Sequence, residues 1–409
     1  MRYGLIGGRL SHSHSPAIHK LLGGYEYALY ELVPEQLEAF LSQPDIGGLN
    51  VTIPYKRAVF PYCDTLDPIA QRTGSVNTLV LKSGRIVGYN TDYDGFLYLA
   101  RGAGVEFCGK KVVILGSGGT SATVQAAVSD QGAREIVVVS RSGPENYDTL
   151  ARHADADVLI NTTPVGMYPL IDACPVSLAL FPRLCGVLDV IYNPLRTRLI
   201  LEAQSRGIPS AGGLAMLVAQ AHAAAQRFTD TQIPMSRIDE ILRSLEQALS
   251  NIVLIGMPGC GKTRVGEALC ALTGRPLVDT DELIEQEWKK SPGEIIETQG
   301  EAAFRDKEAD AVLSASKQGG RIISTGGGAP LFERNRIALL QNGRIFYLKR
   351  DITRLAVAGR PLSKNLPQLY EQRDPVYRAF ANAEICNDRK PEDVAQAIFM
   401  AFCSHWSPC

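Results

Sequence analysis

Residues 251–263 read Asn-Ile-Val-Leu-Ile-Gly-Met-Pro-Gly-Cys-Gly-Lys-Thr, an apolar run that leads into a glycine-rich turn. The last eight residues fit the pattern G-x-x-x-x-G-K-[ST] at every fixed position, after a predicted strand and before a predicted helix. Gly259 and Gly261 let backbone N–H groups close around phosphate oxygens. Lys262 would neutralise the β- and γ-phosphates of a nucleotide, and the Thr263 hydroxyl would ligate Mg²⁺. This stretch therefore predicts a parallel α/β domain that handles phosphate.

A second apolar run, Val112–Leu115, leads into the turn Gly116-Ser-Gly118-Gly119. Against the dinucleotide pattern G-x-G-x-x-G, Ser121 stands where the third glycine would be, so this pattern alone is weak. One sheet rarely needs two phosphate cradles, so each glycine turn predicts a doubly wound sheet of its own.

The next apolar run, Ile136–Val139, ends in Ser140-Arg141-Ser142. No acidic residue stands there to take a ribose 2′-hydroxyl, whereas an arginine and two hydroxyls suit a 2′-phosphate, which favours NADP. A solvated Arg141 at a strand end is the alternative.

The whole chain has the composition of a folded, multidomain protein. Its 409 residues carry a formal net charge of −1, with 45% hydrophobic and 21% charged residues. The near-zero charge argues against binding to nucleic acid or a membrane surface, which needs a large cationic face. At about 100–200 residues per domain, the length allows two to four domains. Nine cysteines without a C-x-x-C pair, no apolar leader and no run of about 20 apolar residues favour a cytoplasmic protein.

Short apolar runs alternate with longer helical patterns, which indicates βαβ units. The apolar spacing over Met235–Leu249 predicts an amphipathic helix, and a strand follows it at once. We therefore expect a domain boundary near 248–251 with almost no linker. The predicted strands are Val112–Leu115, Ile136–Val139, Val158–Ile160, Ile252–Ile255, Arg321–Ser324 and Ile345–Leu348.

Charged residues follow the turn at 256–263 in pairs. Asp279 and Asp281 stand at i and i+2 on a predicted strand end, so their side chains would point the same way. Such a pair suits phosphoryl transfer, with one carboxylate in the shell of a metal ion and the other on a nucleophilic hydroxyl. Arg305 and Glu308 share a helical face at i and i+3. Taken alone, the first pair is more often part of a solvated loop, and the second a surface ion pair.

Two further segments complete this half of the chain. Thr325-Gly326-Gly327-Gly328 follows a predicted strand and allows main chain to approach a ligand closely. A basic stretch with several prolines suits a lid over phosphates, with a solvated basic face as the alternative. Its cations are Arg350, Arg354, Arg360, Lys364, Arg373 and Arg378.

Together and in this order, these features resemble shikimate kinase over residues 251–409. The shared motifs are the phosphate turn, D-T-D at 279–281, F-R-D-K-E at 304–308, the three glycines, R-P-L at 360–362 and R-D-P-V-Y at 373–377.

The resemblance implies that Asp281 binds the shikimate hydroxyls, and that Arg305 and Arg373 hold its carboxylate. A planar carboxylate is best bound by a bidentate guanidinium, which agrees with that assignment. The other implied residues are Asp279 in the outer Mg²⁺ shell, Gly327 and Gly328 on the substrate, and Arg360 as a lid arginine on ATP.

In the first half, four segments have little periodicity but many polar side chains: 11–16, 50–56, 75–78 and 90–95. Read one by one, each is a turn, since Ser-Pro and Asp-Gly are common turn formers. His12 and His14 have no third ligand at a sensible spacing, so a metal site is not predicted there.

Taken together, these segments resemble shikimate dehydrogenase over about 1–245. The shared motifs are S-H-S-P at 13–16, N-V-T-I-P-Y-K at 50–56, V-N-T at 76–78, N-T-D at 90–92, G-S-G-G at 116–119, N-T-T-P-V-G-M at 161–167 and G-G-L-A-M-L-V-A-Q at 212–220.

This second resemblance implies Lys56 and Asp92 as the catalytic pair. Reduction of a ketone by hydride needs a proton for the developing alkoxide, and an ammonium near a carboxylate can supply it. The implied substrate ligands are Ser13, Ser15, Thr52, Asn77, Asp92, Gln220 and Tyr192. The implied NADP site is lined by Gly116, Gly118, Gly119, Ser140, Arg141, Thr162 and Gly213.

The predicted architecture is α/β throughout. Residues 1–250 form a two-lobe dehydrogenase, with a Rossmann-type NADP lobe at about 102–213 and a substrate lobe at about 1–101 plus 214–250. Residues 251–409 form a P-loop kinase with a parallel sheet.

The predicted function is bifunctional. NADPH would reduce 3-dehydroshikimate to shikimate, and ATP with Mg²⁺ would phosphorylate shikimate to shikimate 3-phosphate. The partners are small molecules, with no nucleic acid and no membrane, and a homo-oligomer is left open. The alternatives are an NAD-dependent quinate/shikimate dehydrogenase fused to a kinase, and a pathway sensor that binds its ligands without turnover.

Overall fold

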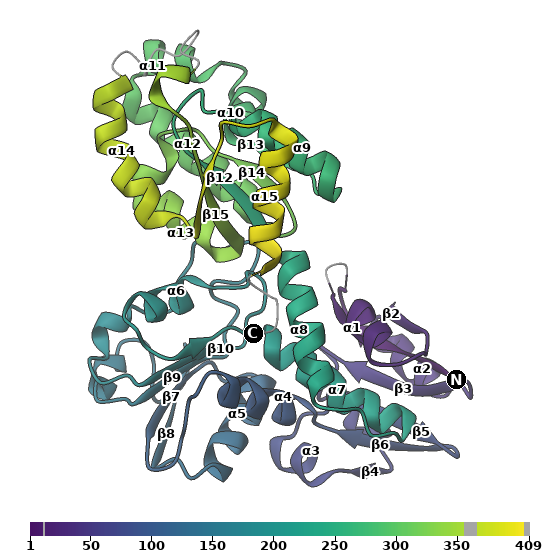
Figure 1. The fold of residues 1–409 in the computed structure, drawn as a ribbon. Coiled ribbons are helices and arrows are strands. Elements are labelled where there is room, and N and C mark those ends of the chain that lie inside the picture. The colour runs from purple at the N-terminus through teal and green to yellow at the C-terminus, as the bar shows by residue number, and fades with distance from the viewer. Residues whose placement is uncertain (11–12, 356–365, 405–409) are drawn as a thin grey trace. The chain divides into compact units, whose positions relative to one another are not determined.

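The computed structural model describes residues 1–10, 13–355 and 366–404 (Figure 1). It divides into two compact units. The N-terminal unit comprises Met1–Val165, Cys174–Asn193 and Glu202–Leu242, and the C-terminal unit comprises Gly166–Ala173, Pro194–Leu201 and Arg243–Cys409. Across the described ranges, no helix combines the length and the apolar character needed to cross a bilayer.

The first sheet of the N-terminal unit is mixed, with the strand order β2-β1-β3-β5-β6-β4. Strands β1, β2 and β3 run parallel, whereas β5 is antiparallel to both of its neighbours. The strands are β1 (Arg2–Gly7), β2 (Tyr27–Glu31), β3 (Ile46–Val51), β4 (Thr65–Leu66), β5 (Thr78–Lys82) and β6 (Arg85–Tyr89). The helices between and after them are α1 (Ser15–Leu22), α2 (Leu37–Leu41), α3 (Pro68–Thr73) and α4 (Asp92–Gly102).

The second sheet is parallel, with the order β11-β10-β9-β7-β8. Counted along the chain this is 2-1-3-4-5, a doubly wound order whose switch point lies between β7 and β9. The strands are β7 (Lys111–Leu115), β8 (Glu135–Val139), β9 (Val158–Asn161), β10 (Gly186–Asp189) and β11 (Ser210–Ala211). The helices in this part of the chain are α5 (Gly119–Asp130) and α6 (Arg198–Ser205), and α7 (Leu214–Thr229) and α8 (Ser236–Leu249) follow the last strand. The predicted strands at 112–115, 136–139 and 158–160 and the amphipathic helix at 235–249 are confirmed.

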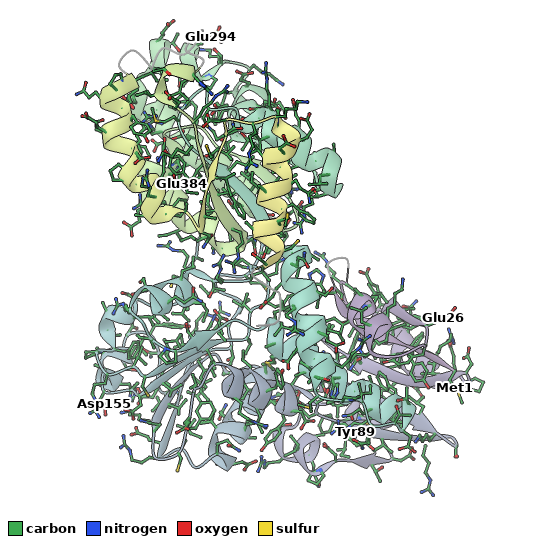
Figure 2. All side chains as sticks on the ribbon, in the orientation of Figure 1. Met1, Glu26, Tyr89, Asp155, Glu294 and Glu384 are labelled. Carbon is green, nitrogen blue, oxygen red and sulfur yellow. The ribbon has the colours of Figure 1, made fainter. Side chains whose placement is uncertain are left out.

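Helix α7 returns from the second sheet to pack on α4 and on the first sheet (Figure 1). A Cβ at Gly95 on α4 would lie 2.6 Å from the carbonyl oxygen of Met216 on α7, so glycine permits this close approach. The reading of Asp94-Gly95 as a turn is therefore wrong, because both residues lie inside α4. At the end of β6, the Tyr89 ring (Figure 2) lies 5.1 Å from the guanidinium carbon of Arg227 on α7.

The sheet of the C-terminal unit is parallel, with the order β13-β14-β12-β15-β16. Its strands are β12 (Asn251–Ile255), β13 (Leu277–Asp279), β14 (Ile322–Ser324), β15 (Gly343–Lys349) and β16 (Ala383–Cys386). Its helices are α9 (Lys262–Thr273), α10 (Thr280–Trp288), α11 (Pro292–Gln299), α12 (Glu301–Ser316), α13 (Glu333–Asn342), α14 (Leu366–Phe380) and α15 (Pro391–Ser404). The three predicted strands are confirmed, and the central strand β12 is fully buried along its apolar run.

Candidate active sites

Lys56 and Asp92 form an ion pair beside the first sheet. Lys56 Nζ lies 2.6 Å from Asp92 Oδ2, and only 19% and 11% of the two side-chain surfaces are exposed. Lys56 lies in the loop after β3, whereas Asp92 is the first residue of α4, where the positive end of the helix dipole favours a carboxylate. The fold thus brings together two residues that are 36 positions apart.

Asn77 connects this pair to helix α7. Its Oδ1 accepts a hydrogen bond from the backbone N–H of Thr91 at 2.7 Å, and its Nδ2 donates to Oγ1 of Thr91 at 3.0 Å. The same Nδ2 donates to Oε1 of Gln220 at 3.4 Å. Because Thr91 immediately precedes Asp92, Asn77 holds the chain where α4 begins. Two predicted substrate ligands, Asn77 and Gln220, therefore lie in contact next to the predicted catalytic pair.

The remaining predicted substrate ligands lie at the ends of nearby elements. Ser15 begins α1, and its N–H donates to the hydroxyl of Ser13 at 3.2 Å. The ring of His14, between them, lies 5.9 Å from the ring of Tyr192 in an edge-on arrangement. Thr52 follows β3, and its N–H donates to a carbonyl oxygen of β1 at 3.0 Å. Burial raises the pKa of Tyr192, so its hydroxyl stays a neutral hydrogen-bond donor.

The dinucleotide turn follows β7 at the switch point of the second sheet. Gly116 has a φ of +106°, and a Cβ there would lie 2.7 Å from Oγ1 of Thr162, so this position requires glycine. Ser121, in place of the third glycine, is fully buried and donates to the carbonyl oxygen of Gly116 at 2.7 Å. Its hydroxyl therefore closes the turn. Gly119 begins α5, whose first backbone N–H groups can bind a pyrophosphate.

The predicted 2′-phosphate ligands end strand β8. Ser140 donates its N–H to the carbonyl oxygen of Glu145 at 3.1 Å, so the chain folds back on itself there. Arg141 is exposed at this strand end. Gly213 lies at the start of α7, where a Cβ would be 2.1 Å from the carbonyl oxygen of Val190. The structure therefore gives Gly213 a packing role whether or not it touches a cofactor.

Gly118 and Gly116 make a matched pair of variants. A Cβ at Gly118 would meet no atom within 4 Å, and its backbone is extended, so Gly118→Ala should destabilise the fold by less than about 1 kcal/mol. The added methyl group would enter the space in front of α5, so we expect a higher KM for the dinucleotide. Gly116→Ala should instead lower the melting temperature, because alanine at positive φ costs about 1–2 kcal/mol before the clash is counted. Thermal melting and cofactor titration measure the two effects, and equal melting temperatures for both variants would contradict this account.

The phosphate turn of the C-terminal unit surrounds the start of α9. Gly256, Gly259 and Gly261 have φ values of +144°, +78° and +98°, which side chains rarely adopt. Lys262 is buried, and its Nζ donates to the carbonyl oxygens of Gly256 at 3.0 Å and Met257 at 3.1 Å. The positive charge of Lys262 therefore lies over the turn, where it would neutralise bound phosphate oxygens.

Thr263 and Asp279 supply the oxygens that Mg²⁺ prefers. The hydroxyl of Thr263 donates to Oδ2 of Asp279 at 3.0 Å, and Oδ1 of Asp279 accepts from the N–H of Asp281, also at 3.0 Å. Within the described ranges, no three His, Cys, Asp or Glu side chains gather as a metal site. Thr263 and Asp279 are the residues that would hold a magnesium ion bound with ATP.

The two aspartates differ from their predicted arrangement. Strand β13 ends at Asp279 and α10 begins at Thr280, so Asp281 lies in a helical turn. The prediction that both residues lie on one strand is wrong, because the backbone changes from strand to helix between them, so strand alternation does not set the direction of the Asp281 side chain. Asp281 instead lies against the three glycines, since a Cβ at Gly326 would be 2.9 Å from its Oδ1.

Arg305 and Glu308 form a buried ion pair, so the surface alternative is wrong. Arg305 Nη1 lies 2.9 Å from Glu308 Oε2, and 10% and 1% of the side-chain surfaces are exposed. Burial raises the pKa of Glu308 despite the neighbouring guanidinium. A Cβ at Gly328 would lie 2.4 Å from Arg305 Nη1, so a glycine at that position leaves room for the guanidinium.

Arg373 lies on another helix, near Glu308 and Tyr377. This helix is α14, where Arg373 lies one turn before Tyr377, and both side chains are buried. Its positive charge opposes the rise that burial causes in the pKa of Tyr377 and of Glu308. The hydroxyl of Tyr377 donates to the carbonyl oxygen of Gly327. Both arginines that are predicted to bind a carboxylate therefore lie near Glu308, and Arg305 also lies against Gly328. The predicted lid residue Arg360 lies outside the described residues.

Sequence reasoning missed a chain of hydrogen bonds behind Asn77. The hydroxyl of Tyr27 donates to Oδ1 of Asn50 at 2.8 Å, and Nδ2 of Asn50 donates to Oγ1 of Thr78 at 3.1 Å. Thr78 in turn donates to Oδ1 of Asn77 at 3.1 Å. Asn50 and Thr78 lie within the motifs at 50–56 and 76–78, so the sequence offered a signal for both residues. Tyr27 on β2 lies in no motif, so the sequence offered no signal for it.

Comparisons with known proteins show which families the two parts of the chain resemble. Residues 5–79 match the family model of the shikimate dehydrogenase substrate binding domain. A curated relative from Methanopyrus kandleri, named shikimate dehydrogenase (NADP(+)), is 38% identical over 270 residues, which are 58% of this chain and 93% of the relative. The chain belongs to the shikimate dehydrogenase family. Residues 258–402 match the shikimate kinase family model, so the chain joins a dehydrogenase to a kinase domain of the same pathway.

Solved dehydrogenase structures resemble the N-terminal part. A chorismate mutase/shikimate 5-dehydrogenase fusion protein from Clostridium acetobutylicum has a TM-score of 0.58 and 37% identity, over 60% of this chain and 97% of that one. Shikimate 5-dehydrogenase from Thermus thermophilus, in complex with NADP(H) and shikimate, has a TM-score of 0.55 and 30% identity, over 60% of this chain and 99% of that one. The protein is a bifunctional shikimate-pathway enzyme.

Proposed function

We propose that the dehydrogenase part reduces 3-dehydroshikimate to shikimate with NADPH, and that the kinase part phosphorylates shikimate to shikimate 3-phosphate with ATP and Mg²⁺. The 2.6 Å contact between Lys56 and Asp92 carries the first assignment, because it places a proton donor beside the predicted substrate ligands. The second assignment rests on Asp281 and Arg305, which converge on one glycine turn.

In the dehydrogenase, bound NADPH supplies the hydride. Lys56 donates a proton from Nζ to the ketone oxygen as negative charge develops on it, and Asp92 holds the ammonium in place. Asn77 and Gln220 orient the substrate next to that pair. The open space before Gly118 admits the pyrophosphate at the start of α5.

In the kinase, bound Mg·ATP supplies the phosphoryl group. Asp281 accepts a hydrogen bond from the attacking hydroxyl and aligns it, and Lys262 offsets charge on the phosphate oxygens. Arg305 and Arg373 bind the shikimate carboxylate through paired N–H donors. Those two arginines therefore fix which hydroxyl reaches Asp281.

We assign residues 1–250 to the dehydrogenase and 251–409 to the kinase, with lobes at about 1–101 plus 214–250 and about 102–213. The last division between the compact units, at Leu242 and Arg243 inside α8, supports a boundary at that helix, whereas Gly166–Ala173 and Pro194–Leu201 group with the C-terminal unit.

One experiment tests both reactions. The full chain is given 3-dehydroshikimate, NADPH and Mg·ATP, and NADPH loss and shikimate 3-phosphate are followed together. Removing Mg²⁺ with EDTA should abolish phosphorylation, because the charge on the phosphates is then unscreened. NADPH oxidation should continue unchanged, because no metal ion is assigned to that site.

Each contrary outcome removes a defined part of the proposal. Loss of NADPH oxidation in EDTA would contradict the proposal that the dehydrogenase reaction needs no metal ion. Binding of shikimate without turnover of either substrate would favour the sensor, and faster turnover with NADH than with NADPH would favour the NAD-dependent alternative.

A further inference from the structure

A cavity of about 660 Å³ lies beside β8, the edge strand of the second sheet. Its wall begins at Ser117 in the dinucleotide turn, continues past Ser140 and Ser142 at the end of β8, and ends at Glu145 and His153. In a doubly wound fold the end of this strand is where the adenosine ribose of a dinucleotide lies. The cavity therefore connects the predicted pyrophosphate and ribose sites to an acidic residue.

Glu145 is held at the strand end by its own backbone and by its carboxylate. Its carbonyl oxygen accepts the N–H of Ser140 at 3.1 Å. Its Oε2 lies 3.1 Å from Nε2 of His153 and accepts the hydroxyl of Thr149 at 2.8 Å. The contact with His153, followed by that with Thr149, lowers the pKa of the Glu145 carboxyl, so the group is an anion at neutral pH.

His153 contacts Glu145 through one ring nitrogen, Nε2. Its side chain is 12% exposed, and its Nδ1 is buried without a hydrogen-bond partner in the described part of the chain. The neutral ring can donate from Nε2 to Glu145, and the protonated ring would add a charge pair. With either form of the ring, Glu145 lines the cavity, and 34% of its side-chain surface is exposed.

We infer that Glu145 determines how strongly the dehydrogenase prefers NADP over NAD, an inference that rests on the proposed dehydrogenase function. A carboxylate accepts a hydrogen bond from a ribose 2′-hydroxyl, but it repels a 2′-phosphate. Arg141 at the same strand end attracts that phosphate. Glu145 and Arg141 therefore act in opposite directions, and Glu145 extends the cofactor range of this enzyme toward NAD.

Glu145 lies outside the sequence motif that favoured NADP. The run Ser140-Arg141-Ser142 contains no acidic residue, which by itself favours NADP. The turn that follows brings Glu145 back against Ser140, so an acidic group reaches the strand end from outside the motif.

The test compares Glu145→Gln with Asp148→Asn. Glutamine keeps the shape and the bond to Thr149 but removes the charge, whereas Asp148 is exposed on the same loop and does not line the cavity. Dissociation constants of the full chain for NADP⁺ and NAD⁺ are measured by calorimetry, which requires no turnover. These whole dinucleotides are used because adenosine phosphates would also bind the kinase turn.

We expect Glu145→Gln to shift the ratio of the two dissociation constants toward NADP⁺ by about tenfold or more. Asp148→Asn should leave the ratio within about twofold of the parent enzyme, because an exposed charge is screened. An unchanged ratio in Glu145→Gln, or an equal shift in both variants, would overturn the inference. If instead the parent enzyme binds both dinucleotides but does not oxidise NADPH with 3-dehydroshikimate, the proposed function fails and the binding ratio still decides the role of Glu145.

Discussion

Lys56→Ala should lower kcat for the reduction of 3-dehydroshikimate by about 10²- to 10⁴-fold, the usual contribution of a positioned general acid. The KM for the substrate should change little, because Ser13, Asn77 and Gln220 are the proposed ligands of its hydroxyls and carboxylate. In the parent enzyme the ammonium lies 2.6 Å from Asp92 and is mostly shielded from water. Without it, the alkoxide must take its proton from solvent, and the buried carboxylate of Asp92 loses its partner.

The bifunctional chain supplies its own control for this variant. Phosphorylation of shikimate by the same preparation should match the parent enzyme, which would exclude global unfolding. Lys82→Ala removes a lysine whose pair with Asp230 is exposed, and it should leave both activities unchanged. A large rise in KM with a normal kcat would mean that Lys56 binds substrate without transferring a proton.

Lys262→Ala should lower the rate of shikimate phosphorylation by about 10²- to 10³-fold, the cost of removing one positioned electrostatic donor from a transition state. In phosphoryl transfer, catalysis comes mostly from positioning and from charge stabilisation, so one buried cation has a large effect. Its Nζ already lies within 3.0–3.1 Å of two carbonyl oxygens of the turn. The charge therefore needs little reorganisation before it meets a phosphate.

Initial rates of shikimate 3-phosphate formation, with Mg·ATP varied, measure this effect. Lys290→Ala removes an exposed lysine from the same unit and should behave as the parent enzyme. NADPH oxidation should be unaffected in both variants. Near-normal phosphorylation by Lys262→Ala would show that the turn binds no nucleotide phosphate, and the kinase assignment would then need another site.

The parallel sheets could be predicted because their strands are buried on both faces. Ile252–Ile255 and Val112–Leu115 are continuous apolar runs, and each is fully buried in the structure. The mixed first sheet was harder to predict. Strand β2 (Tyr27–Glu31) is largely exposed and β4 (Thr65–Leu66) has two residues, so neither produces a strong periodic pattern.

The sequence of neighbouring residues was enough to locate the two glycine turns, because a phosphate-binding turn is built from consecutive residues and their backbone N–H groups. The same reasoning failed for Asp281, since a strand changed into a helix within two residues. It also left open whether the pair of Arg305 and Glu308 was exposed, because the burial of a helical face depends on which elements cover it.

Only the tertiary structure decided which residues from distant segments meet. Lys56 reaches Asp92 because the end of β3 lies beside the start of α4, and Glu145 reaches Ser140 because a turn folds the chain back along β8. Such contacts depend on packing between elements, which no local pattern of side chains encodes. Motifs therefore identified the two kinds of chemistry, while folding determined which charges face one another and how far each is shielded from water.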